Sequence, residues 1–149
     1  MNIYMKNMAL LIDTNVMLDW MLEREPFVKQ AGHILRLCID GKVTGYLASH
    51  TILNAFYISR KEKSIEERKR FLLMLCKKFK IIGINEQMLI EALQNDAWQD
   101  LEDGLQMQCA ISAKLDYIIT RDLKGFTNSL VKALSPQEFL EKAREAVIE

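Results

Sequence analysis

The sequence predicts an α/β fold, a three-layer α/β/α sandwich whose mainly parallel sheet has four to five strands. Short apolar segments of strand length alternate along the chain with longer segments of helical periodicity. The expected strands are apolar at consecutive positions, which is typical of strands covered by helices on both faces of a parallel sheet. The chain of 149 residues is expected to form one domain, residues 1–149 with a core at about 8–140.

The order of the elements follows from this alternation. Strands are expected at residues 8–12, 44–49, 79–84, 116–120 and, with a weaker pattern, 130–134. Helices are expected at about 15–23, 26–40, from 49 or 51 to 61, 65–78, 86–96, 100–114 and from 136 onward. The helix that begins near residue 50 is predicted to turn Leu53, Phe56 and Tyr57 towards the core.

Capping residues fix several of these helix ends. Pro26 suits the first turn of its helix, and Gly41 ends that helix. Ser64 with Glu67 predicts a capping box. Ser135, followed by Pro136 and Glu138, predicts the same arrangement for the last helix, with proline in the first turn.

Composition excludes several classes of protein. No apolar segment approaches the roughly 20 residues of a membrane span, and the N-terminus has no secretory signal, so a cytoplasmic protein is expected. Cys38, Cys76 and Cys109 are widely spaced, which predicts buried free thiols rather than disulfides or structural zinc.

Charge is balanced overall but uneven along the chain. Twenty basic and twenty acidic residues cancel, which argues against a protein that coats nucleic acid through net charge alone. Residues 60–80 nevertheless hold nine basic residues and three acidic ones. This segment is either a solvated helix face or a flank that attracts phosphates.

Acidic residues are predicted to meet at the carboxyl ends of the strands, where ligands bind in parallel sheets. Asp13 directly follows the first strand, and Asp122 lies two residues beyond the fourth. Asp100 and Asp103 share a face in the first turn of the helix at 100–114, together with Gly104, Met107 and Ile111. Glu102 is expected to point about 100° away from Asp103.

Each acid also has a purely structural interpretation. Asp13 suits an N-cap, Asp100 and Asp103 suit the start of a helix, and Asp122 suits a turn. Taken together they are harder to explain, because two carboxylates about 5 Å apart repel by roughly 3 kcal/mol at an effective dielectric constant near 20. A bound cation would relieve that repulsion. Oxygen ligands without nearby Cys or His favour Mg²⁺ or Mn²⁺, ions that assist phosphodiester hydrolysis.

Three segments in order carry a family resemblance: "LLIDTNVMLD", "DLEDGLQMQCA" and "DYIITRDLKGF". Their sequence and spacing resemble the PIN domain, whose largest group is the ribonuclease toxins of type II toxin–antitoxin pairs. The resemblance covers residues 8–140 and implies a Mg²⁺- or Mn²⁺-dependent endoribonuclease that cleaves single-stranded RNA. It also implies a cognate antitoxin protein and a homodimer.

The resemblance assigns roles to individual residues. It implies that Asp13, Asp103 and Asp122 are catalytic and bind metal, with Asp100 as a further metal ligand. Thr14, Asn15 and Thr120 match small polar positions that support the ligands, and Asn54 is expected to support them as well. Asp19 matches an acid that is common after the first motif and is interpreted as structural. Phe126 is interpreted as a packing residue.

Two positions depart from the family pattern. Asn54 stands where many PIN domains place a glutamate ligand, so the site has one less charge there. An extra acid in the segment Asp100–Glu102–Asp103 offers a compensation. Gly125 stands where relatives often carry an acid before the Phe.

Three basic side chains near this edge are candidates for substrate contacts. His50 ends the second strand and is either an RNA contact or a satisfied boundary residue. Arg121 and Lys124 flank Asp122 and either hold a phosphate or belong to a solvated loop.

Two competing functions stay open. A PIN-like fold with weakened catalysis could act as an RNA- or protein-binding regulatory module, with Asn54 marking the lost activity. A receiver-like signalling domain is disfavoured, because Asp13 is followed by Thr14 rather than by an acid and because Lys132 lies inside the weak fifth strand.

Overall fold

The computed structural model describes residues 7–98 and 100–148, which form five parallel strands, seven α-helices and two 3-10 helices. The strands are β1 (Ala9–Ile12), β2 (Thr44–Ala48), β3 (Lys80–Ile82), β4 (Tyr117–Ile119) and β5 (Ala133–Leu134). The helices are α2 (Thr14–Met21), α3 (Val28–Ile39), α4 (Ser49–Ile58), η1 (Ser59–Lys61), α5 (Ile65–Lys78), α6 (Glu86–Gln94), α7 (Leu101–Ser112), η2 (Lys124–Phe126) and α8 (Pro136–Ile148). The predicted α/β fold is confirmed.

The strand order places the first strand at the centre of the sheet. The order is β3-β2-β1-β4-β5, and every pairing is parallel. Along the chain, β2 and β3 are added on one side of β1, and β4 and β5 are then added on its other side. The direction therefore reverses between β1 and β4, and a crevice outside their carboxyl ends is the usual ligand site of such sheets.

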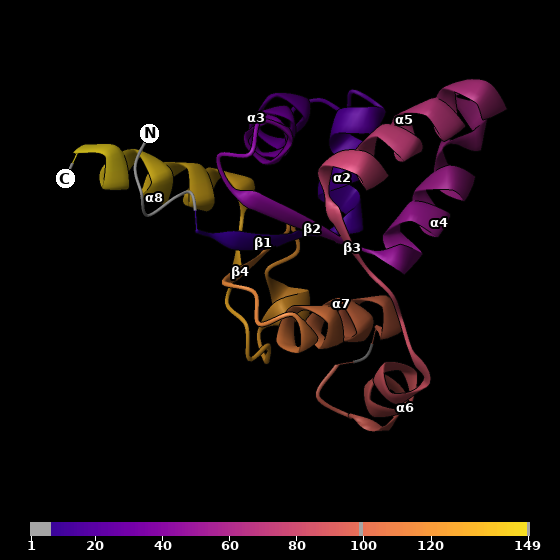
Figure 1. The fold of residues 1–149 in the computed structure, drawn as a ribbon. Coiled ribbons are helices and arrows are strands. Elements are labelled where there is room, and N and C mark those ends of the chain that lie inside the picture. Colours follow the sequence, from indigo (N-terminus) through magenta and orange to yellow (C-terminus); the bar gives the residue numbers. More distant parts are fainter. Residues whose placement is uncertain (1–6, 99, 149) are drawn as a thin grey trace.

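Helices cover both faces of the sheet (Figure 1). Leu10 and Ile12 of β1 point into a core formed with α2, α3, α5 and α8. Leu11 points the other way, into a core with Met107 and Ala110 of α7. α6 packs on α7 at the outside of this layer. Because side chains alternate along a strand, both faces of β1 must be apolar, which explains the consecutive apolar residues in the sequence.

The capping box predicted at Ser135 and Glu138 is complete, the one predicted at Ser64 shows only the bond to the serine side chain, and Pro26 lies outside its helix. The Ser64 side chain accepts a hydrogen bond from Glu67 N at 3.1 Å. Ser135 Oγ accepts from Glu138 N, and Glu138 Oε1 accepts from Ser135 N, both at 3.1 Å. The prediction that Pro26 occupies the first turn of α3 is wrong, because residues 25–27 form a turn and the helix begins at Val28.

The predicted inner face of α4 is wrong. Leu53 and Tyr57 are each 58% exposed, and the fully buried residues of the helix are Thr51 and Ala55. Phe56 is half-buried against the main core. The buried side of the helix combines Ala55 in the main core with the Thr51 hydroxyl, which lies 2.8 Å from that of Thr14 on α2. Large apolar side chains are left on the outside of α4.

The cysteines follow the prediction at two of three positions. Cys38 and Cys109 are buried free thiols, and burial raises their pKa values to about 12 and about 11. Cys76 is a free thiol that is exposed on α5, which corrects the prediction for this residue. It follows the buried Leu75 by one position and so lies on the outer side of the helix.

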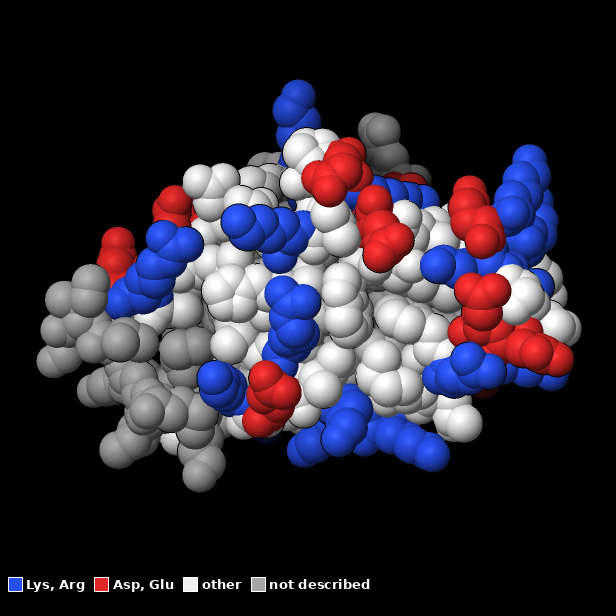
Figure 2. Space-filling view, turned by 90° about the horizontal axis from the view of Figure 1, so that it is seen from above, with Lys and Arg blue, Asp and Glu red and all other residues white. Residues whose placement is uncertain are grey.

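Charges on the face formed by α2, α3 and α5 are dispersed. Figure 2 shows Lys and Arg interspersed with Asp and Glu across this face, with uncharged surface between them. Several cations of residues 60–80 have local partners: Arg68 Nη1 donates to Phe56 O at 2.7 Å and Arg60 Nη1 to Tyr57 O at 2.7 Å. The segment's role as a phosphate-attracting flank stays a prediction.

Within residues 7–98 and 100–148, no helix combines the length and the apolar character that a membrane span requires.

Candidate active site

Asp13 lies at the point where the sheet order reverses. It follows β1 directly and is the N-cap of α2, where its Oδ1 accepts a hydrogen bond from Thr14 N at 2.9 Å. The residue is 5% exposed. Asp13 therefore has the N-cap role that the sequence suggested. Its buried carboxylate also accepts further hydrogen bonds, which an N-cap does not require. Asn15, the next residue of α2, is exposed.

The neighbouring strand β4 brings Thr120 and Asp122 to the same edge. Thr120 follows β4 as Asp13 follows β1, and Ile12 is paired with Ile119 in the sheet. Thr120 Oγ1 donates to Asp13 Oδ2 at 2.8 Å and accepts from Asp122 N at 3.0 Å. One hydroxyl therefore ties the loop that carries Asp122 to the Asp13 carboxylate.

The first turn of α7 approaches this edge from the other layer. Asp100 is the N-cap of α7, and its Oδ1 accepts from Asp103 N at 3.1 Å. Gln106 touches Asp13, and Glu102 lies one turn earlier on the same face of the helix. The charge of Glu102 reaches Asp13 and Asp103 and raises both of their pKa values, and its offset of about 100° from Asp103 stays a prediction. Ile111 is 37% exposed, so the helix face predicted to include Met107 and Ile111 is not buried as far as Ile111.

Gly125 provides the space in which two of the carboxylates meet. A Cβ at this position would lie 2.5 Å from Asp103 Oδ2 and 2.9 Å from Asp122 Oδ2. Gly125 N also donates to Asp122 Oδ1 at 3.2 Å. The departure from an acid at this position thus has a physical reason, because carboxylate oxygens from α7 and from the loop after β4 fill the place of a side chain.

Electrostatics at this edge reflect the proximity of the acids. The pKa of Asp103 is raised to about 7, mainly by burial and then by the charges of Asp100, Asp13, Asp122 and Glu102, in that order. Burial also raises the pKa of Asp13, although hydrogen bonds from Thr120, Thr14 and Gln106 oppose the shift. Carboxylates from three separate segments therefore repel one another at one edge of the sheet.

A buried polar cluster supports Asp13 and was not predicted from the sequence in this form. Gln106 and Thr51 are each 0% exposed. Gln106 Nε2 lies 3.2 Å from Asp13 Oδ1, 3.2 Å from Thr51 Oγ1 and 3.4 Å from Thr14 Oγ1. The available sequence signal was a glutamine three residues after Asp103 inside an apolar helix segment.

His50 and Asn54 lie on one side of α4, four residues apart. Both ring nitrogens of His50 are buried without a hydrogen-bond partner among the described residues, so the satisfied boundary role is not observed. Burial lowers the pKa of His50, and the nearby Glu102 charge opposes that shift. Asn54 is half-buried.

Arg121 is engaged with a structural partner. Its Nε donates to Asp19 Oδ2 at 2.6 Å, and its guanidinium carbon lies 3.9 Å from the centre of the Phe27 ring. Asp19 is 1% exposed, and its pairing with Arg121 agrees with the structural role predicted for it. Lys124 is exposed at the start of η2. Phe126 is 3% exposed in the core beneath α7, as predicted for a packing residue.

The donor atoms at this edge suit a hard divalent cation, although they do not form a closed cage. Among residues 7–98 and 100–148, no three His, Cys, Asp or Glu side chains lie close enough together to hold a metal ion. The Oδ2 atoms of Asp103 and Asp122 both lie beside Gly125. Mutual repulsion keeps such carboxylates apart, and a cation with oxygen ligands relieves it.

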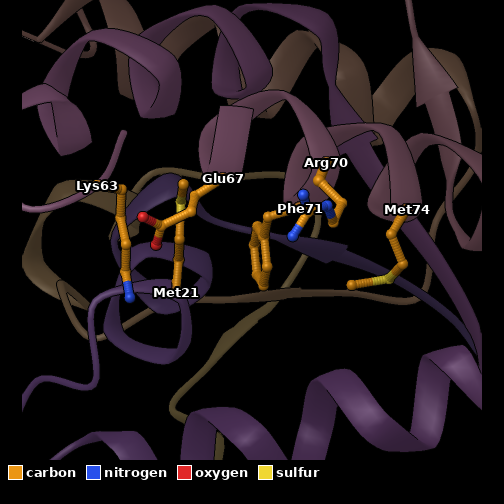
Figure 3. Close-up of a pocket in the computed structure, with 6 residues that line it drawn as sticks. All are labelled: Met21, Lys63, Glu67, Arg70, Phe71 and Met74. Carbon is orange, nitrogen blue, oxygen red and sulfur yellow. The ribbon is translucent and has the colours of Figure 1, made fainter. Parts of the chain in front are cut away.

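A separate groove lies between α2 and α5 (Figure 3). Met21, Phe71 and Met74 supply its apolar surface, and Lys63, Glu67 and Arg70 surround them. None of these six residues belongs to the acidic edge. A methionine-rich groove with a charged rim is typical of surfaces that bind other proteins.

Comparisons with known proteins agree with this geometry. A family model described as PIN domain matches residues 9–124. No curated protein matches the sequence significantly.

Solved structures share the fold at low identity. A toxin–antitoxin complex from Klebsiella pneumoniae is 22% identical with a TM-score of 0.64, over 85% of this chain and 97% of the other. VapBC-1 from nontypeable Haemophilus influenzae is 15% identical with a TM-score of 0.64, over 87% and 99%. VapC20 from Mycobacterium tuberculosis, a sarcin-ricin loop cleaving toxin, is 7% identical with a TM-score of 0.60, over 73% and 86%.

Proposed function

The chain belongs to the PIN domain family, and from that premise we propose that it is a Mg²⁺- or Mn²⁺-dependent endoribonuclease specific for single-stranded RNA. We further propose that it is the toxin of a type II toxin–antitoxin pair and that it acts in the cytoplasm as a single-domain protein. The low-identity neighbours named above include toxin–antitoxin complexes and an RNA-cleaving toxin, which supports this assignment.

One observation carries the proposal. The pKa of Asp103 is raised to about 7 by burial and by four neighbouring acids, so the metal-free site is electrostatically unfavourable at neutral pH. Proteins retain such electrostatically unfavourable clusters of charge mainly at functional sites. A divalent cation is the simplest ligand that would turn this repulsion into attraction.

The acids have distinct proposed roles. Asp13, Asp103 and Asp122 would hold the cation, because they come from three segments at one edge, and a bound cation would have to draw them closer together than they lie without it. Asp100 caps α7 and adds negative charge beside Asp103, and its direct ligation stays a prediction. Glu102 supplies the charge that Asn54 lacks, since its field reaches Asp13, Asp103 and His50.

The surrounding residues orient these carboxylates for hydrolysis of a phosphodiester by in-line attack of water. A bound cation would polarise the phosphate and activate the water. Thr120 Oγ1 and Thr14 N hold the two oxygens of Asp13, and the loop after β4 is fixed by the same hydroxyl. Substrate contacts by His50, Lys124 and Arg121 stay predictions, and Arg121 would have to bind a phosphate while paired with Asp19.

Metal-dependent cleavage of a mixed RNA panel tests the proposal. We expect single-stranded RNA to be cut in Mg²⁺ or Mn²⁺ and to stay intact in EDTA, because the acids need a cation to bind a phosphate. Duplex RNA and single-stranded DNA of the same sequence serve as substrate controls. If a folded preparation free of partner protein cuts none of the RNAs, the ribonuclease assignment is wrong.

The second candidate function is a regulatory module without catalysis, and Asn54 is the observation that favours it. An amide at this place brings no charge to the metal site. Binding of Mn²⁺ and of RNA without any cleavage would support this alternative. Cleavage that requires the metal would exclude it.

We propose that the cognate antitoxin binds the groove between α2 and α5. The groove combines an apolar surface from Met21, Phe71 and Met74 with a rim on which two basic side chains outnumber one acid, which suits an apolar segment that also carries acids. The proposed homodimer would use a different surface, and the exposed Leu53 and Tyr57 on α4 are candidates for it.

The substitution Met74→Glu tests the antitoxin site. We expect affinity for the protein encoded beside this gene to fall at least about tenfold, because a charge would be buried in the apolar groove. Cleavage by the free protein should be unchanged. Leu73→Glu is the matched control, since Leu73 is adjacent on α5, 56% exposed and outside the groove. If calorimetry gave the two variants the same affinity for that protein, the antitoxin would not bind in this groove.

A further inference from the structure

The buried glutamine beside Asp13 has an unusual set of contacts. Gln106 is 0% exposed, and its Nε2 lies within 3.4 Å of three oxygens that belong to Asp13, Thr51 and Thr14. Its Oε1 is buried with no hydrogen-bond partner in the described part of the chain. A buried acceptor without a partner is destabilising, so an apolar residue of the same shape would serve the fold at least as well.

The direction of the Gln106 amide is set by the carboxylate. A reversed amide would let Oε1 accept from the Thr14 and Thr51 hydroxyls, but it would place two acceptors, Oε1 and Asp13 Oδ1, against each other. The observed direction donates to Asp13 and leaves Oε1 unpaired. The hydrogen bond to Asp13 is therefore kept although it leaves Gln106 Oε1 without a hydrogen-bond partner in the described part of the chain.

The contacts on Asp13 leave only one acceptor position free. A carboxylate oxygen has two lone-pair sites. Oδ1 accepts from Thr14 N at 2.9 Å and from Gln106 Nε2 at 3.2 Å, so both of its sites are used. Oδ2 accepts from Thr120 Oγ1 at 2.8 Å and keeps one site. The arrangement reserves Oδ2 for a ligand.

Gln106 also links this carboxylate to the helix that carries Asp103. It lies three residues after Asp103 and one turn after Glu102 on α7, while Asp13 belongs to the junction of β1 and α2. The Thr51 contact adds α4 as a third point of attachment. A single side chain thus joins the two layers at the place where their acids must approach one another.

We infer that Gln106 is a positioning residue that fixes Asp13 relative to the acids of α7 and reserves Asp13 Oδ2 for the divalent cation. The inference rests on the proposed metal-dependent function and extends it to a residue that touches neither metal nor RNA. Supporting side chains of this kind typically change metal affinity or activity by about 10- to 100-fold when they are replaced.

The substitution Gln106→Met tests the inference, because methionine has a similar shape and cannot donate to Asp13. We expect Mn²⁺ affinity, followed by electron paramagnetic resonance, to weaken about 10- to 100-fold. The kcat for RNA cleavage should fall with little change in KM. The Tm of the metal-free protein should stay within about 4 °C of wild type, because the unpaired Oε1 is lost together with the hydrogen bond.

Two further variants make the outcome unambiguous. Gln108→Met is the matched control, since Gln108 lies on α7 but faces away from Gln106. If Gln106→Met does not fold, Gln106→Asn replaces it, because it keeps an amide that is one methylene too short to reach Asp13. Mn²⁺ affinity and kcat within twofold of wild type would overturn the inference. A wild-type protein that neither binds Mn²⁺ nor cleaves RNA would instead overturn the proposed function, and the inference with it.

Discussion

Replacement of Asp103 by asparagine is expected to abolish cleavage while making the metal-free protein more stable. Loss of one charged ligand should lower kcat/KM by about 10²- to 10⁴-fold, the range that follows from several kcal/mol of metal-assisted transition-state stabilisation. The gain in stability follows from the raised pKa of Asp103, since asparagine cannot ionise and so removes repulsion from the neighbouring acids.

The pH dependence of this gain has a definite sign. The pKa of Asp103 is about 7 in the folded protein and near 3.8 when the chain is unfolded. Between these values the folded state keeps a proton that the unfolded state has lost, so wild-type stability falls as pH rises through this window. The Tm advantage of Asp103→Asn in EDTA should therefore grow from about pH 4 to pH 7 and then level off.

The control for this experiment is Asp40→Asn, the same change at an exposed acid on the opposite edge of the sheet, where α3 ends. Its Tm difference from wild type should not follow this pH profile. Added Mn²⁺ should raise the Tm of wild type more than that of Asp103→Asn. A mutant that is less stable than wild type at pH 8 in EDTA would show that repulsion does not dominate this site.

Much of this architecture could be predicted because the determining signals are local. Short apolar strands, the Ser64 and Ser135 caps, and an acid at the end of β1 are each visible in a short segment of sequence. The parallel topology then brings Asp13 and Asp122 to one edge without further information.

The parts that could not be predicted depend on contacts between distant segments. Hydrophobic periodicity points Leu53 and Tyr57 inward, but α4 instead buries Thr51 and Ala55, and the Thr51 hydroxyl meets Thr14 and Gln106. Gln106 in turn reaches Asp13 from α7. No local pattern identifies which polar residue of a helix will find a buried partner on another element.

Replacement of Gly125 by alanine is expected to reduce cleavage strongly without unfolding the protein. The new Cβ would lie 2.5 Å from Asp103 Oδ2, 3.3 Å from Asp103 Cγ and 2.9 Å from Asp122 Oδ2, so both carboxylates would have to move. They are the free ends of side chains, which can shift while the backbone stays in place. A displacement of about 1 Å at a reacting centre can cost roughly 100-fold in rate, and we expect a loss of that order in kcat/KM.

Gly83→Ala is the matched control, because a Cβ there has no atom within 4 Å among the described residues. Cleavage by Gly83→Ala should equal that of wild type, and both alanine variants should unfold within a few degrees of it. If Gly125→Ala also cleaves RNA and binds Mn²⁺ like wild type, then Asp103 and Asp122 cannot act from the positions they occupy beside Gly125. The metal would then have to bind elsewhere among the acids, of which Asp13, Asp100 and Glu102 remain.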